Sequence, residues 1–192
     1  MVGKKMFVII VASLVMLIIA AAWSYAFRPG QQVQLTKLKK CEKCDLTAAD
    51  MAGADLEGAN LQGANMTGAN FSTANLSGAN LRGAEMAGIR LTSANLIGAN
   101  LNNANLTGAT LIKASLTSAD LSDANLTNAR LIDARLTDAN LTNANLTGAR
   151  LNGASLRGAT LVNTSLSGAR LDNAAWIDGT TCKEGSVGEC RQ

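Results

Sequence analysis

Large hydrophobic residues recur at every fifth position over most of this chain. They occupy all 27 such positions from Leu46 to Trp176, of which 22 are Leu, three are Met, and the other two are Phe71 and Trp176. A second series lies two residues before the first and is Ala at 24 of its 27 positions. Residues 46–178 are therefore one uninterrupted series of five-residue units.

A period of five fits neither an amphipathic helix nor an alternating strand. Five residues of an α-helix turn the chain by about 140° beyond a full turn, so the leucines would spiral around every face. Gly or Asn in every unit instead indicates a regular turn. The pattern predicts a short extended side and a turn in each unit, with Leu and Ala directed inward. Four units would close a square coil, and successive coils would pair at strand spacing, about 4.8 Å.

Two units carry a resemblance to a known family. Ala59-Asn60-Leu61-Gln62-Gly63 and Ala104-Asn105-Leu106-Thr107-Gly108 match the A(D/N)LXX pattern of pentapeptide-repeat proteins, which the chain resembles over residues 41–178. The resemblance implies an all-β, right-handed quadrilateral β-helix of about seven coils, roughly 32 Å long at strand spacing. The expected core includes Leu56, Leu61, Phe71, Leu111 and Leu131, with Trp176 filling the last coil.

The first 27 residues resemble an export segment. Lys4 and Lys5 precede an apolar run from Phe7 to Trp23 that only Ser13 interrupts. The run suits a transmembrane signal-anchor helix, with the repeats held outside the cytoplasm, in the periplasm or its equivalent. It also suits a signal peptide whose cleavage releases a secreted protein. A buried helix of a soluble protein is the remaining alternative.

Short segments flank the repeats and contain all four cysteines. Residues 28–45 form a linker and an N-terminal cap with Cys41 and Cys44, and residues 179–192 form a tail with Cys182 and Cys190. In an exported chain, paired cysteines indicate disulfides. A rod of the expected length holds its ends about 30 Å apart, whereas a disulfide needs Cα atoms within about 7 Å. The predicted pairs are therefore Cys41–Cys44 and Cys182–Cys190.

Residues twenty apart should stack in columns on the rod's surface. One column ends in Arg130, Arg150 and Arg170, which is either a face for an anion or protein partner or a solvated charged face. Ile112 and Ile132 stack in another column and form a candidate apolar contact. A column of Thr beside Asn105, Asn125 and Asn145 forms a ladder that suits polysaccharide or ice, although Thr also favours strands.

Composition narrows the function classes. The chain has no histidine, which removes the usual general base and most metal sites, so we expect no enzymatic activity, no metal and no cofactor. Between Leu46 and Asp178 eight basic and ten acidic residues leave a net charge of −2. This weak charge indicates no basic patch of the kind that binds nucleic acid.

The sequence thus favours a non-enzymatic rod in the cell envelope that binds or scaffolds an unknown protein partner. Its open ends allow end-to-end association, and a side-by-side homodimer is a further option. One alternative is a DNA-mimicking, gyrase-interacting protein, an activity of some family members, which the weak charge and the export segment disfavour. Another is a rod that binds a ligand or surface through its Thr and Asn ladder.

Overall fold

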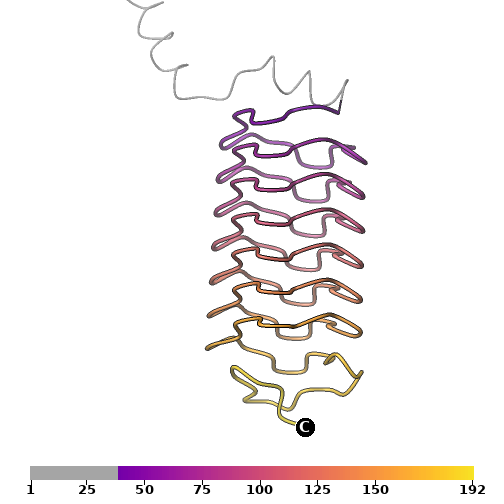
Figure 1. Cartoon of the computed structure of the whole chain (residues 1–192), viewed down its shortest axis with the longest axis vertical. Coiled ribbons are helices and arrows are strands. Elements are labelled where there is room, and N and C mark those ends of the chain that lie inside the picture. Colours follow the sequence, from indigo (N-terminus) through magenta and orange to yellow (C-terminus); the bar gives the residue numbers. More distant parts are fainter. Residues whose placement is uncertain (1–38) are drawn as a thin grey trace, which may run out of the picture.

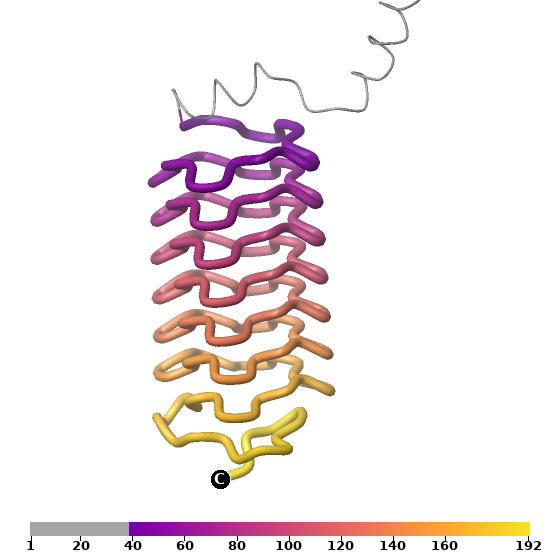
Figure 2. The backbone as a smooth tube through the Cα atoms, turned by 180° about the vertical axis from the view of Figure 1, so that it is seen from behind, coloured from indigo at the N-terminus to yellow at the C-terminus, as the bar shows by residue number. Residues whose placement is uncertain are grey.

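The computed structural model describes residues 39–192, and these form a rod of stacked coils (Figures 1 and 2). Residues 39–192 contain no helix and no strand longer than a single bridge residue. Parallel bridges recur every fifth residue, and each joins a residue to the one twenty positions later, from Lys40–Asn60 to Ser155–Ala175. The expected twenty-residue coil with four short sides is therefore confirmed.

The interior of the rod is built from the two inward series. The central residues Leu56, Leu61, Phe71, Leu111 and Leu131 are at most 1% exposed. Most of the alanines two residues earlier are equally buried, and their small size lets the four sides close around the leucines. Burial of each Leu contributes about 2 kcal/mol. Trp176 differs from expectation, because it packs against the core but stays partly exposed at the end of the rod.

In a typical unit the backbone bonds to the neighbouring coils, across its own turn and to one side chain. Around Leu106, the central N–H donates to Asn125 O of the next coil, and Ala109 N closes the turn on Leu106 O at 3.0 Å. Thr107 N donates to the side chain of Asn105 at 3.2 Å. An Asn or Asp before the central residue thus supplies the acceptor for the one N–H that no neighbouring coil can reach.

The corner residue two positions after each centre from Leu46 to Leu171 has a positive φ, between 54° and 70°. Glycine adopts this conformation without strain, which explains its frequency there. Asn or Asp also occupies many corners, in keeping with the tolerance of these residues for left-handed backbone.

Past the last coil the chain reverses direction. The parallel pattern ends at Ala175, and the tail pairs through the antiparallel bridges Arg170–Val187 and Ala175–Thr181. The expected signal-anchor or signal peptide of residues 1–27, and most of the linker, lie outside the described residues. Among residues 39–192, no helix has the length and apolar character needed to cross a membrane.

Candidate functional site

The arginine column lies along one side of the rod in its C-terminal half. Bridges join Thr110 to Arg130, Arg130 to Arg150 and Arg150 to Arg170, so the three arginines occupy successive coils. All three are exposed. Arg170 forms an ion pair with Asp172 at 3.4 Å, whereas Arg130 and Arg150 form none with any residue of 39–192. The column therefore keeps two guanidinium groups available.

The adjacent side carries two further arginines that the sequence analysis did not single out. Arg135 and Arg157 border a shallow depression of about 470 Å³ together with Thr137, Ser155 and Ala175. The hydroxyls of Thr137 and Ser155 lie 3.2 Å apart between them. Neither arginine has an ion-pair partner within the described part of the chain. Reading the sequence in steps of twenty would have placed Ser155 on the coil after Arg135. The small serine side chain leaves room beside that arginine.

The hydroxyl and amide ladder is present, but its groups bind one another. Thr107 and Thr127 donate their hydroxyl protons to Asn105 and Asn125, at 2.8 and 2.6 Å. The same carboxamide oxygens accept backbone N–H groups at 3.2 and 3.1 Å. These polar groups hold the turn, which leaves fewer of them for a ligand lattice.

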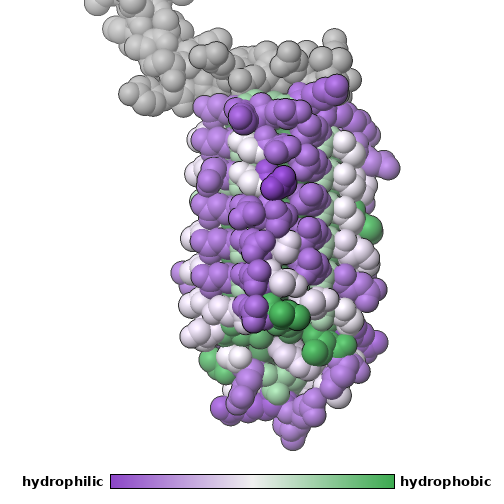
Figure 3. Space-filling model, viewed as in Figure 1, coloured by the Kyte–Doolittle hydropathy of each residue, from purple (hydrophilic) through white to green (hydrophobic). Residues whose placement is uncertain are grey.

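The isoleucine column is only partly accessible. Ile112 and Ile132 stack on successive coils and are half-buried, whereas Ile97 on the next side is 46% exposed. The other exposed large hydrophobic residues of the described chain are Val162, Ile177 and Val187, all in its C-terminal part. Figure 3 shows apolar surface near that end of the rod.

Both expected disulfides are present, Cys41–Cys44 at the front end and Cys182–Cys190 in the tail. At the front, Lys39 Nζ lies 3.5 Å from Asp55. A hydrogen bond from the Glu57 backbone, followed by the charge of Lys39, lowers the pKa of Asp55.

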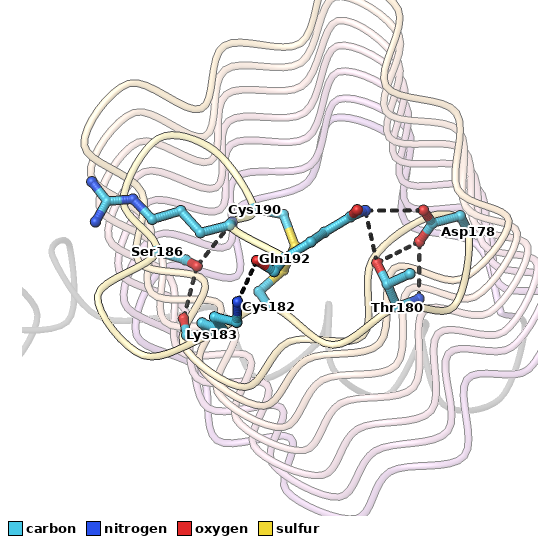
Figure 4. Close-up of a disulfide and its surroundings, with 8 residues drawn as sticks. Asp178, Thr180, Cys182, Lys183, Ser186, Cys190 and Gln192 are labelled. Carbon is cyan, nitrogen blue, oxygen red and sulfur yellow. Dashed lines mark hydrogen bonds between the residues drawn. A yellow bond between two sulfur atoms is a disulfide. The ribbon is translucent and has the colours of Figure 1, made fainter.

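The tail crosses the end of the last coil (Figure 4). On one side of the disulfide, Asp178 accepts hydrogen bonds from the backbone and hydroxyl of Thr180 and from Gln192. Elsewhere in the tail, Gly185 N donates to Asp172 at 2.6 Å. Hydrogen bonding to Thr180 lowers the pKa of Asp178, and the bond from Gly185 lowers that of Asp172.

No catalytic constellation is evident among residues 39–192, nor do three metal-ligating side chains cluster there. The described surface instead offers the two arginine sides and an apolar C-terminal end.

The comparisons with known proteins concern the fold. Two trypsin-treated variants of QnrB1, a plasmid-mediated fluoroquinolone resistance protein, have TM-scores of 0.60 and 0.61 with this chain, at 21% and 22% identity. They cover 78% and 75% of this chain and 77% of their own. A pentapeptide repeat protein of the Arabidopsis thaliana thylakoid lumen is 20% identical over 88% of this chain and 93% of its own, with a TM-score of 0.30. At these identities the likeness to QnrB1 shows the fold alone.

Among curated proteins, none matches this sequence. The sequence model described as pentapeptide repeats matches eight copies, over residues 40–78, 74–111, 104–143 and 139–174. These segments span most of the chain and have the right-handed quadrilateral β-helix as their fold. The chain therefore belongs to the pentapeptide-repeat family.

Proposed function

We propose that this protein is a non-enzymatic binding rod displayed outside the cytoplasm, in the cell envelope. The observation that carries the proposal is the pairing of all four cysteines at the two ends of the rod. Structural disulfides persist in oxidising compartments and are rare in the cytoplasm. The apolar run from Phe7 to Trp23 supplies an export segment in the same chain.

Binding is the activity that this exterior supports. The repeats run from Lys40 to Ala175 without an inserted loop, so their sides present flat columns instead of a closed pocket. Flat, regular faces suit protein partners, as in other solenoid proteins. The alternative of a DNA-mimicking, gyrase-interacting protein is not favoured, because a repeat region with a net charge of only −2 is a poor mimic of DNA.

Cell fractionation with intact-mass measurement tests the location. The native protein should appear in the membrane or extracytoplasmic fraction, with a mass lower by the four hydrogens that two disulfides remove. The same mass separates an uncleaved anchor from a cleaved signal peptide. A cytoplasmic protein with four alkylatable thiols would refute the proposal. Affinity isolation from envelope extract should then recover a stoichiometric protein partner.

A second candidate function is the binding of anionic groups by the arginine sides. At the position that Asn or Asp otherwise occupies, Arg130, Arg135 and Arg150 provide no acceptor for the next N–H. The backbone N–H groups of Ile132, Thr137 and Asn152 therefore have no side-chain partner among the described residues. Arginine there costs the turn a hydrogen bond, which favours a role other than folding.

Inorganic phosphate serves as a probe of this second function. The double variant Arg135→Gln/Arg157→Gln should lose phosphate-induced amide shifts at Thr137 and Ser155. Arg82→Gln, an exposed arginine in the N-terminal half, should keep them. Equal shifts in both variants would exclude the depression as an anion site.

A further inference from the structure

The C-terminal end of the rod is only half covered. Tail residues pair with one half of the last turn of the chain, through Leu171 N to Ser186 O, Asn173 N to Cys182 O and Gly188 N to Ala169 O, at 2.9 to 3.0 Å. No residue of 39–192 pairs in this way with the other half, residues 159–168. This segment, which we call the open edge, belongs to the last parallel coil (Figure 2).

The open edge carries six backbone groups without a partner among the described residues. The donors are Leu161, Asn163, Leu166 and Gly168 N–H, and the acceptors are the carbonyls of Ala159 and Thr164. Their equivalents one coil earlier are bonded, as in Leu141 N to Thr160 O at 2.9 Å and Asn143 N to Val162 O at 2.8 Å. Unpaired edge groups of this kind invite another strand.

Apolar side chains accompany these groups. Leu161 and Leu166 are partly exposed, whereas Leu141 and Leu146 directly beneath them are 0% exposed. Val162 is 56% exposed, the highest value among the large hydrophobic residues of the described chain. The edge therefore offers apolar surface together with hydrogen-bonding groups, and residues 159–168 carry no charge.

The polarity of the edge restricts what fits on it. Each side of a coil directs two N–H groups and one carbonyl toward the C-terminal end, and two carbonyls and one N–H toward the N-terminal end. The same edge of a second copy would set donors against donors and leave at least half of them unpaired. This mismatch disfavours an edge-to-edge pair of two copies and favours a different occupant.

We propose that the open edge binds an extended, uncharged, leucine-containing segment of a partner protein, which adds to the rod as the missing half-coil. This inference rests on the proposed binding function and names the surface that performs it. The segment supplies carbonyls to the four free N–H groups and covers Leu161 and Leu166. Its strands run parallel to the open edge, in the register that joins every other coil.

The test measures amide hydrogen exchange in the full chain, kept in mild detergent because of its N-terminal apolar run. The probe is an acetylated and amidated peptide with the sequence of residues 139–148, which is uncharged and has leucine at five-residue spacing. In the free protein, the amides of Leu161, Asn163, Leu166 and Gly168 should exchange rapidly. Saturating peptide should slow their exchange at least tenfold and leave the earlier coils unchanged.

Matched variants separate edge binding from general adhesion. Leu161→Lys places a charge on the surface to be covered and should abolish the slowing, whereas Val162→Lys, on the outer face, should retain it. Protection of the earlier coils reports whether each variant is folded. A peptide whose two leucines are replaced by aspartate should fail on the unmodified protein, which tests the proposal without altering the chain.

Three results would overturn the proposal. The edge amides are already protected in the free protein, they become protected through self-association as concentration rises, or the peptide leaves them unchanged. All three are measured on purified protein and do not depend on its location. A cytoplasmic location would refute the proposed function but not this inference.

Discussion

At the scale of single residues, the corner position determines how well each unit fits the coil. Fifteen corner or flanking residues other than Gly have a positive φ, and most are Asn, Asp, Ser or Lys. Thr73 is the β-branched member of this set, with φ of 59°. A residue with a Cβ pays about 1–2 kcal/mol for left-handed backbone, and branching at Cβ adds crowding. Thr73 is therefore a strained corner.

Thr73→Gly should stabilise the rod by about 0.5–1 kcal/mol, because relief of strain exceeds the entropy that glycine adds to the unfolded chain. Gly78→Thr is the matched reverse change, since nothing lies within 4 Å of the added Cβ and only the φ of 62° opposes it. It should destabilise by about 1–2 kcal/mol. Urea unfolding measures both, and effects of the same sign would refute the strain argument.

Leu131→Asp should unfold the rod or destabilise it by several kcal/mol, because it places an unpaired carboxylate in a site that is 0% exposed. Asn128→Asp adds the same group at an exposed corner and should change stability by less than about 0.5 kcal/mol. Circular dichroism with urea unfolding compares the two variants. Equal tolerance would disprove the inward direction of the five-residue series.

At the scale of elements, the C-terminal tail is held by two carboxylates and one disulfide. Asp172 accepts from Gly185 N and from Asn152, and Asp178 closes the loop to Thr180 and Gln192. Both aspartates have a pKa lowered from the ordinary 3.8. Their stabilisation is therefore fully present above pH 3.8 and is lost as the pH falls through the lower folded values.

The tail should detach at acidic pH while the rod persists. As the pH falls below 3.8 and Asp172 takes up a proton, the protection factor of the Gly185 amide, its slowing relative to an unstructured amide at the same pH, should fall. The core contains no titrating side chain among its buried residues, so protection of residues 80–140 should not change. In the Asp172→Asn variant, the Gly185 amide should already be less protected at neutral pH, and its protection should depend less on pH. An unchanged acid profile in this variant would show that another group controls the tail.

Reduction of Cys182–Cys190 should loosen the tail and leave the repeats folded. A loop of this length restricts the unfolded chain by about 2–3 kcal/mol in the loop-entropy model. The backbone N–H of Trp176 donates to Thr180 O at 2.7 Å, and the Trp176 side chain should become more exposed when the tail loosens. A Trp23→Phe background makes its emission readable, and a red shift without loss of the β signature is the expected result. Global unfolding on reduction would contradict this prediction.

At the scale of the whole molecule, the rod is a one-dimensional stack in which each coil touches only its neighbours. Coils in the middle are paired on both edges, whereas residues 159–168 are paired on one. Local opening should therefore begin at the C-terminal end. Native-state exchange should be slower in residues 80–140 than in residues 159–168 by more than about tenfold. Uniform protection along the rod would mean that the open edge is closed in solution.

The sequence alone determined the repeat, the inward residues and the disulfide pairs. These follow from the five-residue period and the length of the rod. Each unit repeats the same local geometry, and each coil adds one strand spacing to the distance between the ends. The role of Asn before the central residue was not recognised, since a side-chain acceptor for a backbone N–H is a three-dimensional relation. For the same reason Arg135 and Arg157, which are 22 residues apart, were not associated.

Only the tertiary structure decided how the rod ends. Trp176 continues the central series in sequence, yet it is partly exposed because the tail reverses direction and covers half of the last coil. Nothing in the period of residues 159–168 distinguishes them from earlier units. Their N–H groups lack partners because the residues twenty positions later follow an antiparallel path. A repeat specifies the contacts between its own copies, whereas the edge it leaves at the last copy depends on where the following chain packs.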